Sequence, residues 1–489
     1  MIGNIPQLWP KLSKSIFKEK NRLLLDRIKE LSTELCEWLG RKWFICSHYD
    51  ADGLSSAGIL AKLLLKSKSS FVCRILTNLT TEDVRAVSSV KSDVYVFLDL
   101  GSSEITSIRN YIKGKVFVID HHQIPTVIGE PKGISVLSPE LLGLNGGEVG
   151  CTSVLSGLLA YFAFKDPYYL KLGLVGAVGD LQNGPKNSVN DYLIRAGIKE
   201  GVVSRYKTFT FFKLIDSPIH KGICWNFDPY IPGLTGEEDV VISLLTSANI
   251  RLKEGDRWRK IKELSEEEKS RIVEKIIEFI TRSKSITVKT SDFLRTVHEF
   301  KDERDEMLLT AENFSSLLNA CGRMNREDLA IAISIGFRDR KLLEKARKVM
   351  EERRMMIKEQ IKALRGRERE HDGILIIDGR GVVKERFTGS LATIYSLSPA
   401  LKDKIVVVMT ESSKEELKIS ARTSKTVTSK GLNLGRILNK LARIYGGVGG
   451  GHAVAAGATI KLRGRDYERT KREIIDVIIK EMKRVEGKS

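Results

Sequence analysis

The stretch Ser-His-Tyr-Asp-Ala-Asp-Gly at residues 47–53 lies between two different apolar patterns. Residues 42–47 are mostly apolar and predict a buried strand, whereas residues 54–66 carry apolar side chains at helical spacing. The stretch is therefore predicted to be an acidic loop between a strand and a helix. Asp50 and Asp52 would repel each other in this loop unless a cation lies between them. Asp-Gly is also a common turn dipeptide, so the stretch alone leaves a solvated turn as the alternative.

Strands and helices alternate beyond this loop. The apolar patterns predict strands at 71–76, 94–100 and 116–120, separated by helices at 81–91 and 103–112. Strand–helix–strand connections of this length indicate right-handed crossovers and a mostly parallel sheet. The N-terminal part is therefore of the α/β class, and ligands of such sheets bind at the carboxyl ends of the strands.

Acidic and imidazole side chains follow the later elements at the point where each ends. These side chains belong to Asp99, Asp120, His121, His122 and Asp180. Any single aspartate of the set could merely cap the next helix. Because all of them are expected on the same edge of one sheet as the first loop, we interpret the set as a metal site. Carboxylate oxygens with one or two imidazoles favour Mn²⁺ or Mg²⁺ over zinc.

Composition narrows the class of partner. The chain has 489 residues and a formal net charge of +19, which favours a polyanion, nucleic acid before an acidic membrane surface. No apolar run is long enough to span a bilayer, and residues 1–20 lack the apolar region of a signal peptide. The six cysteines are scattered without a CxxC pair, so we expect free core thiols in a cytoplasmic protein.

We expect three domains, with boundaries at 1–215, 216–365 and 366–489. The middle domain is predicted to be helical, and its helices are expected at 237–245, 258–282 and 342–365, after a rigid Pro/Gly loop at 228–236. A further long helix is expected near the N-terminus, at 12–39. The C-terminal domain is a second α/β unit, with expected strands at 373–377, 404–409, 417–423 and 453–460 and a helix at 432–445.

A glycine-rich stretch at 446–452 follows that last helix and ends in His452. Read as a loop, it would leave backbone N–H groups bare, which is one way in which a chain wraps an anion. The alternative is a segment that only has to turn tightly beside a neighbour. The histidine, with Arg422 and Arg443 in the same basic domain, favours a phosphate contact.

The motifs in their order resemble the DHH phosphoesterase superfamily. They are His-x-Asp-Ala-Asp-Gly at 48–53, Asp99, Asp-His-His at 120–122, Gly-Asp at 179–180 and Gly-Gly-Gly-His at 449–452. The last motif is similar to that of the associated DHHA1 domain. The Pro/Gly loop and the middle segment resemble the archaeal RecJ-like single-strand exonucleases, the GINS-associated branch, and no OB-type domain of bacterial RecJ is evident. The resemblance implies an N-terminal parallel-sheet DHH domain and a smaller C-terminal α/β DHHA1-type domain.

The resemblance also implies roles for particular residues. The implied metal ligands are Asp50, Asp52, Asp99, His121 and Asp180, with His48 either a ligand or a neighbour. Asp99 would bridge two metal ions, His122 would face the phosphate, and Asp120 would orient the pair. The expected catalytic residues are His122, Asp120 and Asp52. The implied substrate-binding residues are Arg422, Gly449, Gly450, Gly451 and His452.

The implied activity is that of a metal-dependent exonuclease with two Mn²⁺ or Mg²⁺ ions. It would hydrolyse single-stranded DNA, RNA or both to 5′-mononucleotides in DNA replication or repair. We expect 5′→3′ digestion over the reverse, although the same metals serve either polarity. The implied partner is the GINS replication complex, and no membrane association is expected. Two alternatives stay open: a replisome subunit that docks on GINS with incidental nuclease activity, and a hydrolase of short oligonucleotides or cyclic dinucleotides.

Overall fold

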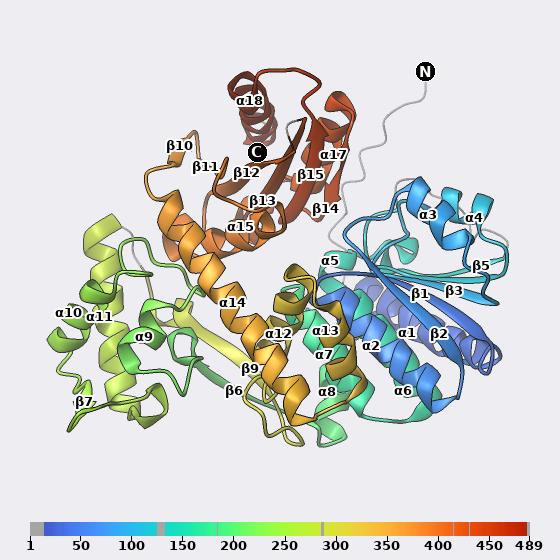
Figure 1. Ribbon diagram of the computed structural model, residues 1–489, viewed down its shortest axis with the longest axis horizontal. Helices are drawn as coiled ribbons and strands as arrows, with labels where there is room; N and C mark the ends of the chain where they lie inside the picture. The colour runs from blue at the N-terminus through green and yellow to red at the C-terminus, as the bar shows by residue number, and fades with distance from the viewer. Residues whose placement is uncertain are drawn as a thin grey trace. The chain divides into compact units, whose positions relative to one another are not determined.

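The computed structural model describes residues 14–124, 133–182, 184–284, 288–413, 415–429 and 431–486. The chain forms two compact units, and each is built from two stretches of sequence (Figure 1). The first unit comprises Met1–Tyr206 and Val297–Arg353, and the second comprises Lys207–Thr296 and Arg354–Ser489. This division differs from the expected boundaries after residues 215 and 365, because part of the middle segment returns to the first unit.

The first unit is organised around a five-stranded parallel sheet of order β2-β1-β3-β4-β5. Its strands are β1 (Lys42–His48), β2 (Ser70–Leu76), β3 (Val94–Leu98), β4 (Lys115–Ile119) and β5 (Ile134–Leu137). The α/β class and the parallel sheet are as the alternating pattern predicts. Strand β1 pairs with β2 on one side and with β3 on the other, so the strand order reverses between β1 and β3. A reversal of this kind opens a crevice at the carboxyl ends of the two strands.

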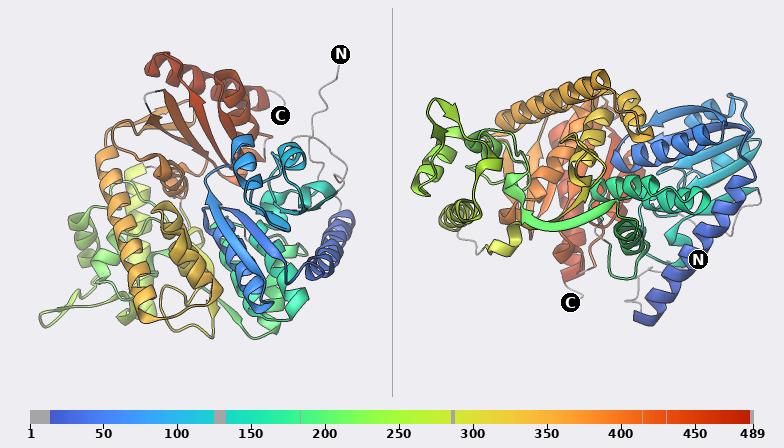
Figure 2. Two further views of the ribbon diagram at one scale, coloured as in Figure 1. Left: turned by 45° about the vertical axis from the view of Figure 1, so that its right-hand side comes forward. Right: turned by 90° about the horizontal axis from the view of Figure 1, so that it is seen from below.

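Helices cover both faces of this sheet (Figure 2). They are α1 (Lys14–Cys36), α2 (Ala51–Lys66), α3 (Thr81–Ser88), α4 (Ile105–Tyr111), α5 (Gly146–Val149), α6 (Thr152–Phe164), α7 (Tyr168–Gly179) and α8 (Val189–Lys199). Trp43 and Ile45 of β1 lie in the core that includes α2, α6 and α7, whereas Phe44 and Cys46 lie in the core formed with α3 and α4. Successive strand residues point to opposite faces, and both faces are covered, which is why residues 43–46 of β1 are all apolar.

Residues 297–353 complete the first unit. Strands β6 (Val203–Phe209) and β9 (Leu294–Phe300) form a two-stranded sheet that leads into and out of the second unit. Helices α12 (Ala311–Arg323) and α13 (Glu327–Ile335) follow, and Phe314 and Leu317 of α12 are buried in the same core as α2 and α7. Helix α14 (Arg340–Leu364) follows, close to the helix expected at 342–365; its first part belongs to the first unit and its last part to the second.

The second unit begins with a helical part. It contains α9 (Ile219–Cys224), α10 (Glu238–Ser247), α11 (Glu266–Lys284) and the hairpin of β7 (Lys253–Glu254) and β8 (Arg257–Trp258). The expected helix at 258–282 is therefore wrong at its start. Ser265 ends the preceding segment, because its Oγ accepts from the N–H of Glu268 at 3.2 Å while Glu268 accepts from the N–H of Ser265 at 2.9 Å. This reciprocal cap sets the first turn of α11.

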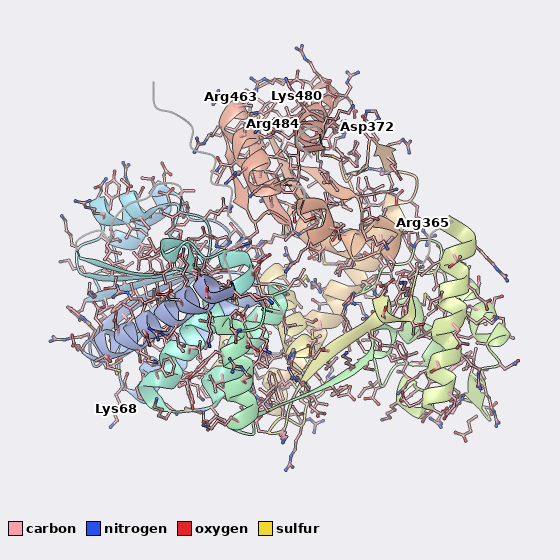
Figure 3. The ribbon with its side chains drawn as sticks, turned by 180° about the vertical axis from the view of Figure 1, so that it is seen from behind. Lys68, Arg365, Asp372, Arg463, Lys480 and Arg484 are labelled. Atoms are coloured by element: carbon pink, nitrogen blue, oxygen red, sulfur yellow. The ribbon has the colours of Figure 1, made fainter. Side chains whose placement is uncertain are left out.

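The C-terminal part of the second unit is a six-stranded mixed sheet of order β10-β11-β12-β13-β15-β14. Its strands are β10 (Glu368–His371), β11 (Ile374–Asp378), β12 (Ile405–Ser413), β13 (Glu416–Arg422), β14 (Val448–Gly451) and β15 (Ala455–Lys461). The helices are α15 (Thr388–Ser396), α16 (Lys425–Thr428), α17 (Leu434–Tyr445) and α18 (Tyr467–Glu486). Basic side chains such as those of Arg463, Lys480 and Arg484 project from this part (Figure 3).

Short 3₁₀ helices occur in both units, at Pro139–Leu142, Thr210–Phe212, Ile261–Glu263, Thr290–Phe293, Glu385–Phe387 and Pro399–Leu401.

The glycine-rich stretch is not the bare loop expected from its sequence. Residues 448–451 form the edge strand β14, which pairs antiparallel with β15. The glycines allow close packing: a Cβ on Gly449 would lie 2.7 Å from the carbonyl oxygen of Leu438 in α17 and 2.9 Å from Cβ of Ala458. Gly450 differs, because a Cβ there would meet nothing within 4 Å. Gly449 thus serves helix–strand packing, whereas Gly447 allows the chain to approach β15, because a Cβ there would lie 2.0 Å from the Thr459 carbonyl oxygen. Gly450 leaves an open backbone surface.

Two other expectations concern the chain as a whole. All six cysteines carry free thiols, as predicted, and four of them are buried. None of the helices that the structure describes is long and apolar enough to cross a membrane.

Candidate metal centre

The candidate site lies where the strand order of the parallel sheet reverses. Asp50 follows β1 and caps α2, because its Oδ1 accepts from the N–H of Gly53 at 3.1 Å. Asp52 is in the first turn of α2 and is almost fully buried. Asp99 follows β3 directly, with a φ of +59° that few non-glycine residues adopt, and aspartate is one of those that tolerate it. The first acidic loop and the end of β3 therefore meet at the crevice of the sheet.

The two carboxylate oxygens of Asp99 face two different imidazoles. Oδ2 lies 3.2 Å from Nδ1 of His48, and Oδ1 lies 3.3 Å from Nε2 of His121. Three groups of possible ligand atoms include this carboxylate, and within each group the atoms lie within 4.8 Å of one another. Two of them contain the imidazoles that face Asp99: His48, Asp50 and Asp99 form one, and Asp52, Asp99 and His121 form the other. The third is Asp99, Asp120 and His122, in which Asp120 already engages His122. This geometry suits two cations that share one bridging carboxylate.

His121 is held in the orientation that a metal ligand needs. Its Nδ1 lies 3.1 Å from the carbonyl oxygen of Gly146, which accepts a hydrogen bond from Nδ1–H and so leaves the lone pair on Nε2. Nε2 in turn lies 3.7 Å from Oδ2 of Asp52 and 3.8 Å from Oδ2 of Asp180. A Cβ on Gly146 would come within 1.9 Å of the His121 carbonyl oxygen, so a larger residue there would displace the histidine.

The start of α6 fixes the carboxylate of Asp52. The N–H of Thr152 donates to Oδ2 at 2.9 Å and the N–H of Ser153 donates to Oδ1 at 2.8 Å. These two groups belong to the first turn of α6, where backbone N–H groups lack partners within the helix and the helix dipole favours an anion. The carboxylate is therefore oriented before any cation binds.

Asp120 and His122 form a neighbouring pair. Oδ1 of Asp120 lies 2.8 Å from Nδ1 of His122 and accepts from its N–H at 3.1 Å, while Oδ2 accepts from the N–H of Ser102 at 2.9 Å. Both oxygens of Asp120 are thus used inside the protein. The side chain of His122 is 37% exposed, in contrast to the buried His121, so it can meet a ligand from solvent.

Gln182 and Asn190 support the site, and sequence reasoning missed both. The Nε2 group of Gln182 donates to Oδ2 of Asp180 at 2.8 Å and to the Gly146 carbonyl at 2.9 Å. Asn190 at the start of α8 then donates to Oε1 of Gln182 at 3.0 Å. Asp180 itself lies at the C-terminal end of α7, after the apolar run. The position of Gln182, two residues beyond the Gly-Asp motif, was the one available signal.

The end of α12 packs against the acidic loop. Asn319 accepts from the N–H of Ala51 at 3.2 Å, and Nη1 of Arg323 donates to the Tyr49 hydroxyl at 3.2 Å. The Tyr49 ring meets the His48 ring edge-on, with centroids 4.6 Å apart. These contacts join residues more than 260 positions apart in sequence, so nothing in the local pattern pointed to them.

Charge crowding changes the acidities in the site. Burial raises the pKa of Asp52 to about 7, and the nearby carboxylate of Asp99 adds to the rise. Burial also raises the pKa of Asp180. For His121, burial alone lowers the pKa, but the carboxylates of Asp180, Asp99 and Asp52 outweigh it and raise the pKa well above its usual range. A cluster that holds extra protons in this way is suited to exchange them for a divalent cation.

The candidate substrate residues lie together at one end of the C-terminal sheet. Arg422 ends β13 opposite Ala455 of β15, and its Nη1 donates to the Ala456 carbonyl at 3.1 Å. The N–H of His452 donates to the Ala455 carbonyl at 2.8 Å. The sheet therefore brings Arg422 and His452 to the same end of β15.

Three family matches agree with this architecture. Residues 42–171 match the DHH family N-terminal domain, residues 215–292 the DHH-CID domain, and residues 385–484 the DHHA1 domain. The first covers the parallel sheet with its acidic loops, and the last covers most of the mixed sheet. The chain belongs to the DHH superfamily.

The chain is similar to a protein of known sequence and to several solved structures. The chain is 27% identical over 423 residues to an uncharacterized protein of Methanocaldococcus jannaschii, which covers 85% of this chain and 89% of that protein. The fold of this chain is similar to that of RecJ from Thermus thermophilus in complex with Mn²⁺ (TM-score 0.53, 15% identity, covering 98% of this chain and 56% of RecJ). It is also similar to CDC45 from Entamoeba histolytica (TM-score 0.58, 13% identity, 96% of this chain and 99% of CDC45). The chain thus spans about half the length of that RecJ, and these identities establish the fold alone.

Proposed function

We propose that the chain is a metal-dependent exonuclease that hydrolyses single-stranded DNA, RNA or both to 5′-mononucleotides. The observation that carries this proposal is the carboxylate of Asp99, whose two oxygens face His48 and His121. A pair of donor groups sharing one carboxylate suits two divalent cations of the Mn²⁺ or Mg²⁺ type, because most of the donors are hard oxygens. The RecJ neighbour was solved with Mn²⁺, which supports this choice of cation.

The residues divide into holders of the cations and residues that act on the substrate. Asp50 and His48 would hold one ion, Asp52 and His121 the other, and Asp99 both; Asp180 is within reach of the second. Bound cations would lower the pKa of a water and neutralise charge on the phosphodiester. His122, held by Asp120, has a raised pKa because Asp120 outweighs the effect of burial. As an imidazolium, it would donate a hydrogen bond to a phosphate oxygen as negative charge grows there.

The remaining parts of the proposal concern substrate and setting. Arg422, Gly449, Gly450, Gly451 and His452 would hold the strand. The net charge of +19 would supply affinity for phosphates that is independent of sequence. We further propose a cytoplasmic role in DNA replication or repair, with GINS as partner. The likeness to CDC45 is one of fold, and it keeps the docking alternative open: a replisome subunit whose nuclease is incidental.

End-labelled substrates test the proposal. Single strands of DNA and RNA, labelled at the 5′ or the 3′ end, are incubated with the chain and Mn²⁺, and the released products are separated by length. We expect mononucleotides, with the 5′ label released first, and no release by Asp99→Asn at equal thermal stability. A substrate preference for very short oligonucleotides or cyclic dinucleotides would favour that alternative instead. Hydrolysis that survives Asp99→Asn would refute the metal centre.

Co-purification separates catalysis from docking. A stable complex with GINS, together with normal growth of a strain that carries Asp99→Ala, would identify docking as the main role. A growth or repair defect in that strain, with the complex intact, would identify nuclease activity as the main role. Asp99 suits this test because its side chain is only 2% exposed, so a partner does not contact it directly. Asp99→Asn in a parallel strain is the control for folding, because asparagine tolerates the φ of +59° better than alanine.

A further inference from the structure

Glu140 is an acidic residue at the carboxyl edge of the parallel sheet, outside the proposed set of metal ligands. It lies three residues after β5, the neighbour of β4, and β4 leads into the Asp-His-His motif at 120–122. Burial raises the pKa of Glu140. The imidazoles of His121 and His122 act in the opposite direction, so they lie within electrostatic range of its carboxylate. None of the motifs of the sequence includes this residue.

A short turn fixes the backbone of Glu140. Pro139–Leu142 form a 3₁₀ helix that Ser138 caps, because its Oγ accepts from the N–H of Glu140 at 3.3 Å. The turn ends at Gly143, whose φ of +66° is one that glycine adopts readily. The N–H of Gly143 donates to the Glu140 carbonyl at 3.0 Å. The side chain of Glu140 therefore starts from a fixed backbone close to the edge of the sheet.

The carboxylate of Glu140 holds the first residue of α5. Its Oε1 accepts from the N–H of Gly146 at 3.0 Å. Oδ1 of Asn145 accepts from the next N–H, that of Gly147, at 3.1 Å. The first N–H groups of a helix lack partners within the helix, and an acidic side chain beside them is favourable. Glu140 and Asn145 thus fix the two peptide groups on either side of Gly146.

The carbonyl oxygen of Gly146 is the point where this turn meets the metal centre. It accepts from Nδ1–H of His121 at 3.1 Å and from Nε2 of Gln182 at 2.9 Å. The two backbones are also in close contact, because a Cβ on Gly146 would lie 1.9 Å from the His121 carbonyl oxygen. A shift of α5 would therefore turn the imidazole of His121 and move its Nε2 relative to Asp52 and Asp99.

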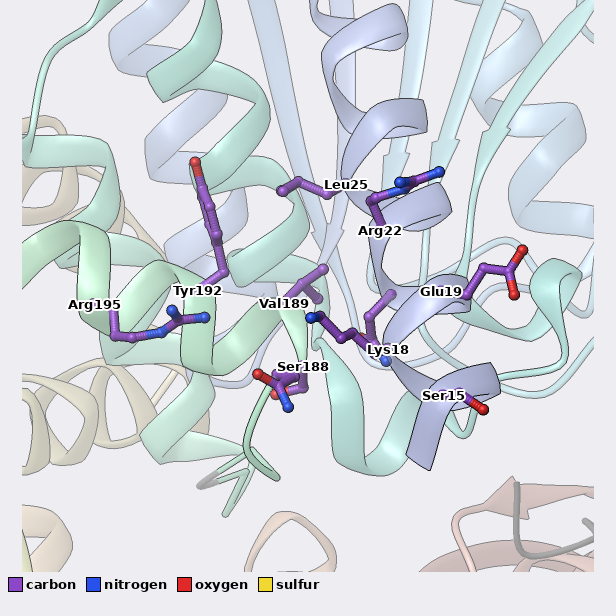
Figure 4. A pocket seen from close by; sticks show the side chains of 11 residues that line it. Ser15, Lys18, Glu19, Arg22, Leu25, Ser188, Val189, Tyr192 and Arg195 are labelled. Atoms are coloured by element: carbon purple, nitrogen blue, oxygen red, sulfur yellow. The ribbon is translucent and has the colours of Figure 1, made fainter. Parts of the chain in front are cut away.

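The start of α8 supports the same carbonyl through Gln182. Asn190 is 1% exposed, and its Nδ2 donates to Oε1 of Gln182 at 3.0 Å. The two residues before it, Ser188 and Val189, line a groove of about 520 Å³ between α1 and α8 (Figure 4). The cations of that groove are exposed side chains, and one of them, Arg195, already forms an ion pair within α8. Helix α8 therefore acts on the metal centre through Asn190 and not through the groove.

We propose that Glu140 is a positioning residue, which holds the imidazole of His121 through Gly146 in the direction that a cation needs. The cation is the one that Asp52 and Asp99 would share with this imidazole. The inference rests on the proposed function and deepens it, because it names what orients one ligand of the metal centre. The ligands of the other cation that follow β1 make no hydrogen bond to α5 in the part of the chain that the structure describes. The effect of Glu140 is therefore specific to one of the two cations.

Mn²⁺ titration of the metal-free full chain tests the proposal without hydrolysis. Calorimetry gives the two affinities, electron paramagnetic resonance distinguishes a single bound ion from a coupled pair, and His121→Ala identifies which affinity belongs to the ion beside His121. Glu140→Leu removes the acceptor and keeps a side chain of similar size. We expect it to bind the ion beside His121 about ten-fold more weakly and the other ion as the unmodified chain does.

Two results of this titration would overturn the proposal. One is equal affinity for both ions in Glu140→Leu and in the unmodified chain. The other is a similar loss for both ions, because a residue that only stabilises the first unit has no preference between them.

Glu140→Gln and Glu140→Asp separate the hydrogen bond from the charge. The amide oxygen of glutamine can accept from the N–H of Gly146 as the carboxylate does, so we expect Glu140→Gln to restore the affinity for the ion beside His121. Aspartate keeps the charge but is one carbon shorter, so Glu140→Asp should behave like Glu140→Leu. Rescue by aspartate and not by glutamine would assign the effect to charge and overturn the positioning role.

Glu312→Leu is the matched control. Glu312 lies in α12 of the same unit, is also half-buried, and accepts from the backbone N–H of His298 at 3.2 Å. Its replacement should lower the melting temperature and leave both Mn²⁺ affinities unchanged. A selective loss of the ion beside His121 in Glu312→Leu would show that this affinity reports on stability, and the case for Glu140 would fail.

The unmodified chain decides the fate of the proposed function. If it binds fewer than two Mn²⁺ ions, the proposed metal centre is refuted and the role of Glu140 with it. If it binds two ions and releases mononucleotides from a single strand, the proposed function stands. Equal Mn²⁺ binding by Glu140→Leu would then refute the positioning role alone.

Discussion

The hydroxyl of Tyr49 accepts a hydrogen bond from Nη1 of Arg323 at 3.2 Å, across 274 positions of sequence. Tyr49 lies inside the acidic loop, and its ring packs edge-on against His48. Arg323 lies at the end of α12, in a segment that the sequence assigned to a different domain. The pair therefore links the acidic loop to a helix that is distant in sequence. Through Tyr49, it also restrains the candidate ligand His48.

Replacement of Arg323 by methionine should loosen that restraint. We expect Mn²⁺ affinity to fall by about ten-fold, as is usual when a group that orients a ligand is lost. Calorimetric titration of the metal-free protein measures the affinity. Arg326→Met is the matched control, because Arg326 lies three residues away and pairs with Asp328 on the surface. Equal Mn²⁺ affinity in the two variants would contradict a positioning role for Arg323.

Gln182→Met should weaken the second half of the site. The change removes the amide that holds Asp180 and leaves a donor of Asn190 without its partner, at a cost of about 1–3 kcal/mol in unfolding free energy. We expect metal affinity to fall by about ten-fold or more.

Gln360→Met supplies the comparison for Gln182→Met. Gln360 is also buried and hydrogen-bonded, but it lies in the second unit. It should lose stability without loss of metal affinity. The role given to Gln182 fails if its variant and that of Gln360 bind Mn²⁺ alike.

The metal-free protein should lose stability as pH rises from about 4 to about 7. Burial and Asp99 raise the pKa of Asp52 from 3.8 to about 7, so the folded chain keeps a proton that the unfolded chain has released. The free energy of unfolding falls with pH wherever the folded state binds more protons. Urea unfolding in EDTA measures the slope. Asp52→Asn, which cannot ionise, should flatten the dependence of the unfolding free energy on pH. An unchanged slope in that variant would show that the pH dependence does not come from Asp52.

Lys171→Met should destabilise the first unit by about 3 kcal/mol, because it breaks a buried ion pair. The Nζ group of Lys171 donates to Glu303 at 2.7 Å and to Asp302 at 2.8 Å, and its side chain is 1% exposed. Guanidinium unfolding measures the loss. Lys66→Met breaks a more exposed pair with Asp166 and should cost less than about 1 kcal/mol. Similar losses in both would show that burial of Lys171 is not decisive.

His452→Ala should weaken single-strand binding more than it alters metal content. The main chain of His452 is held by the Ala455 carbonyl, so removal of the imidazole leaves the turn before β15 in place. Anisotropy with a labelled strand and metal analysis of the same sample give the two readouts. Loss of metal with unchanged strand affinity would remove His452 from the proposed substrate residues.

The class of fold and the location of the acidic cluster followed from local patterns. An apolar run that ends in Asp99 or in Asp50 is visible in sequence, and parallel strands place their carboxyl ends on one edge. The edge strand β14 was missed because its glycines predict a loop, and only pairing with β15 makes it a strand. Tertiary contact overrides local propensity most readily in short segments such as this one.

The sequence by itself determined which side chains could gather at the sheet edge, because each of them lies close to the end of its own strand or helix in the sequence. Only the tertiary structure decided how they are held. Gln182, Asn190 and Arg323 reach the site through side-chain hydrogen bonds that no periodic pattern in the sequence predicts. It also decided that both oxygens of Asp99 are used, because the direction of each oxygen depends on how β1, β3 and β4 stand side by side.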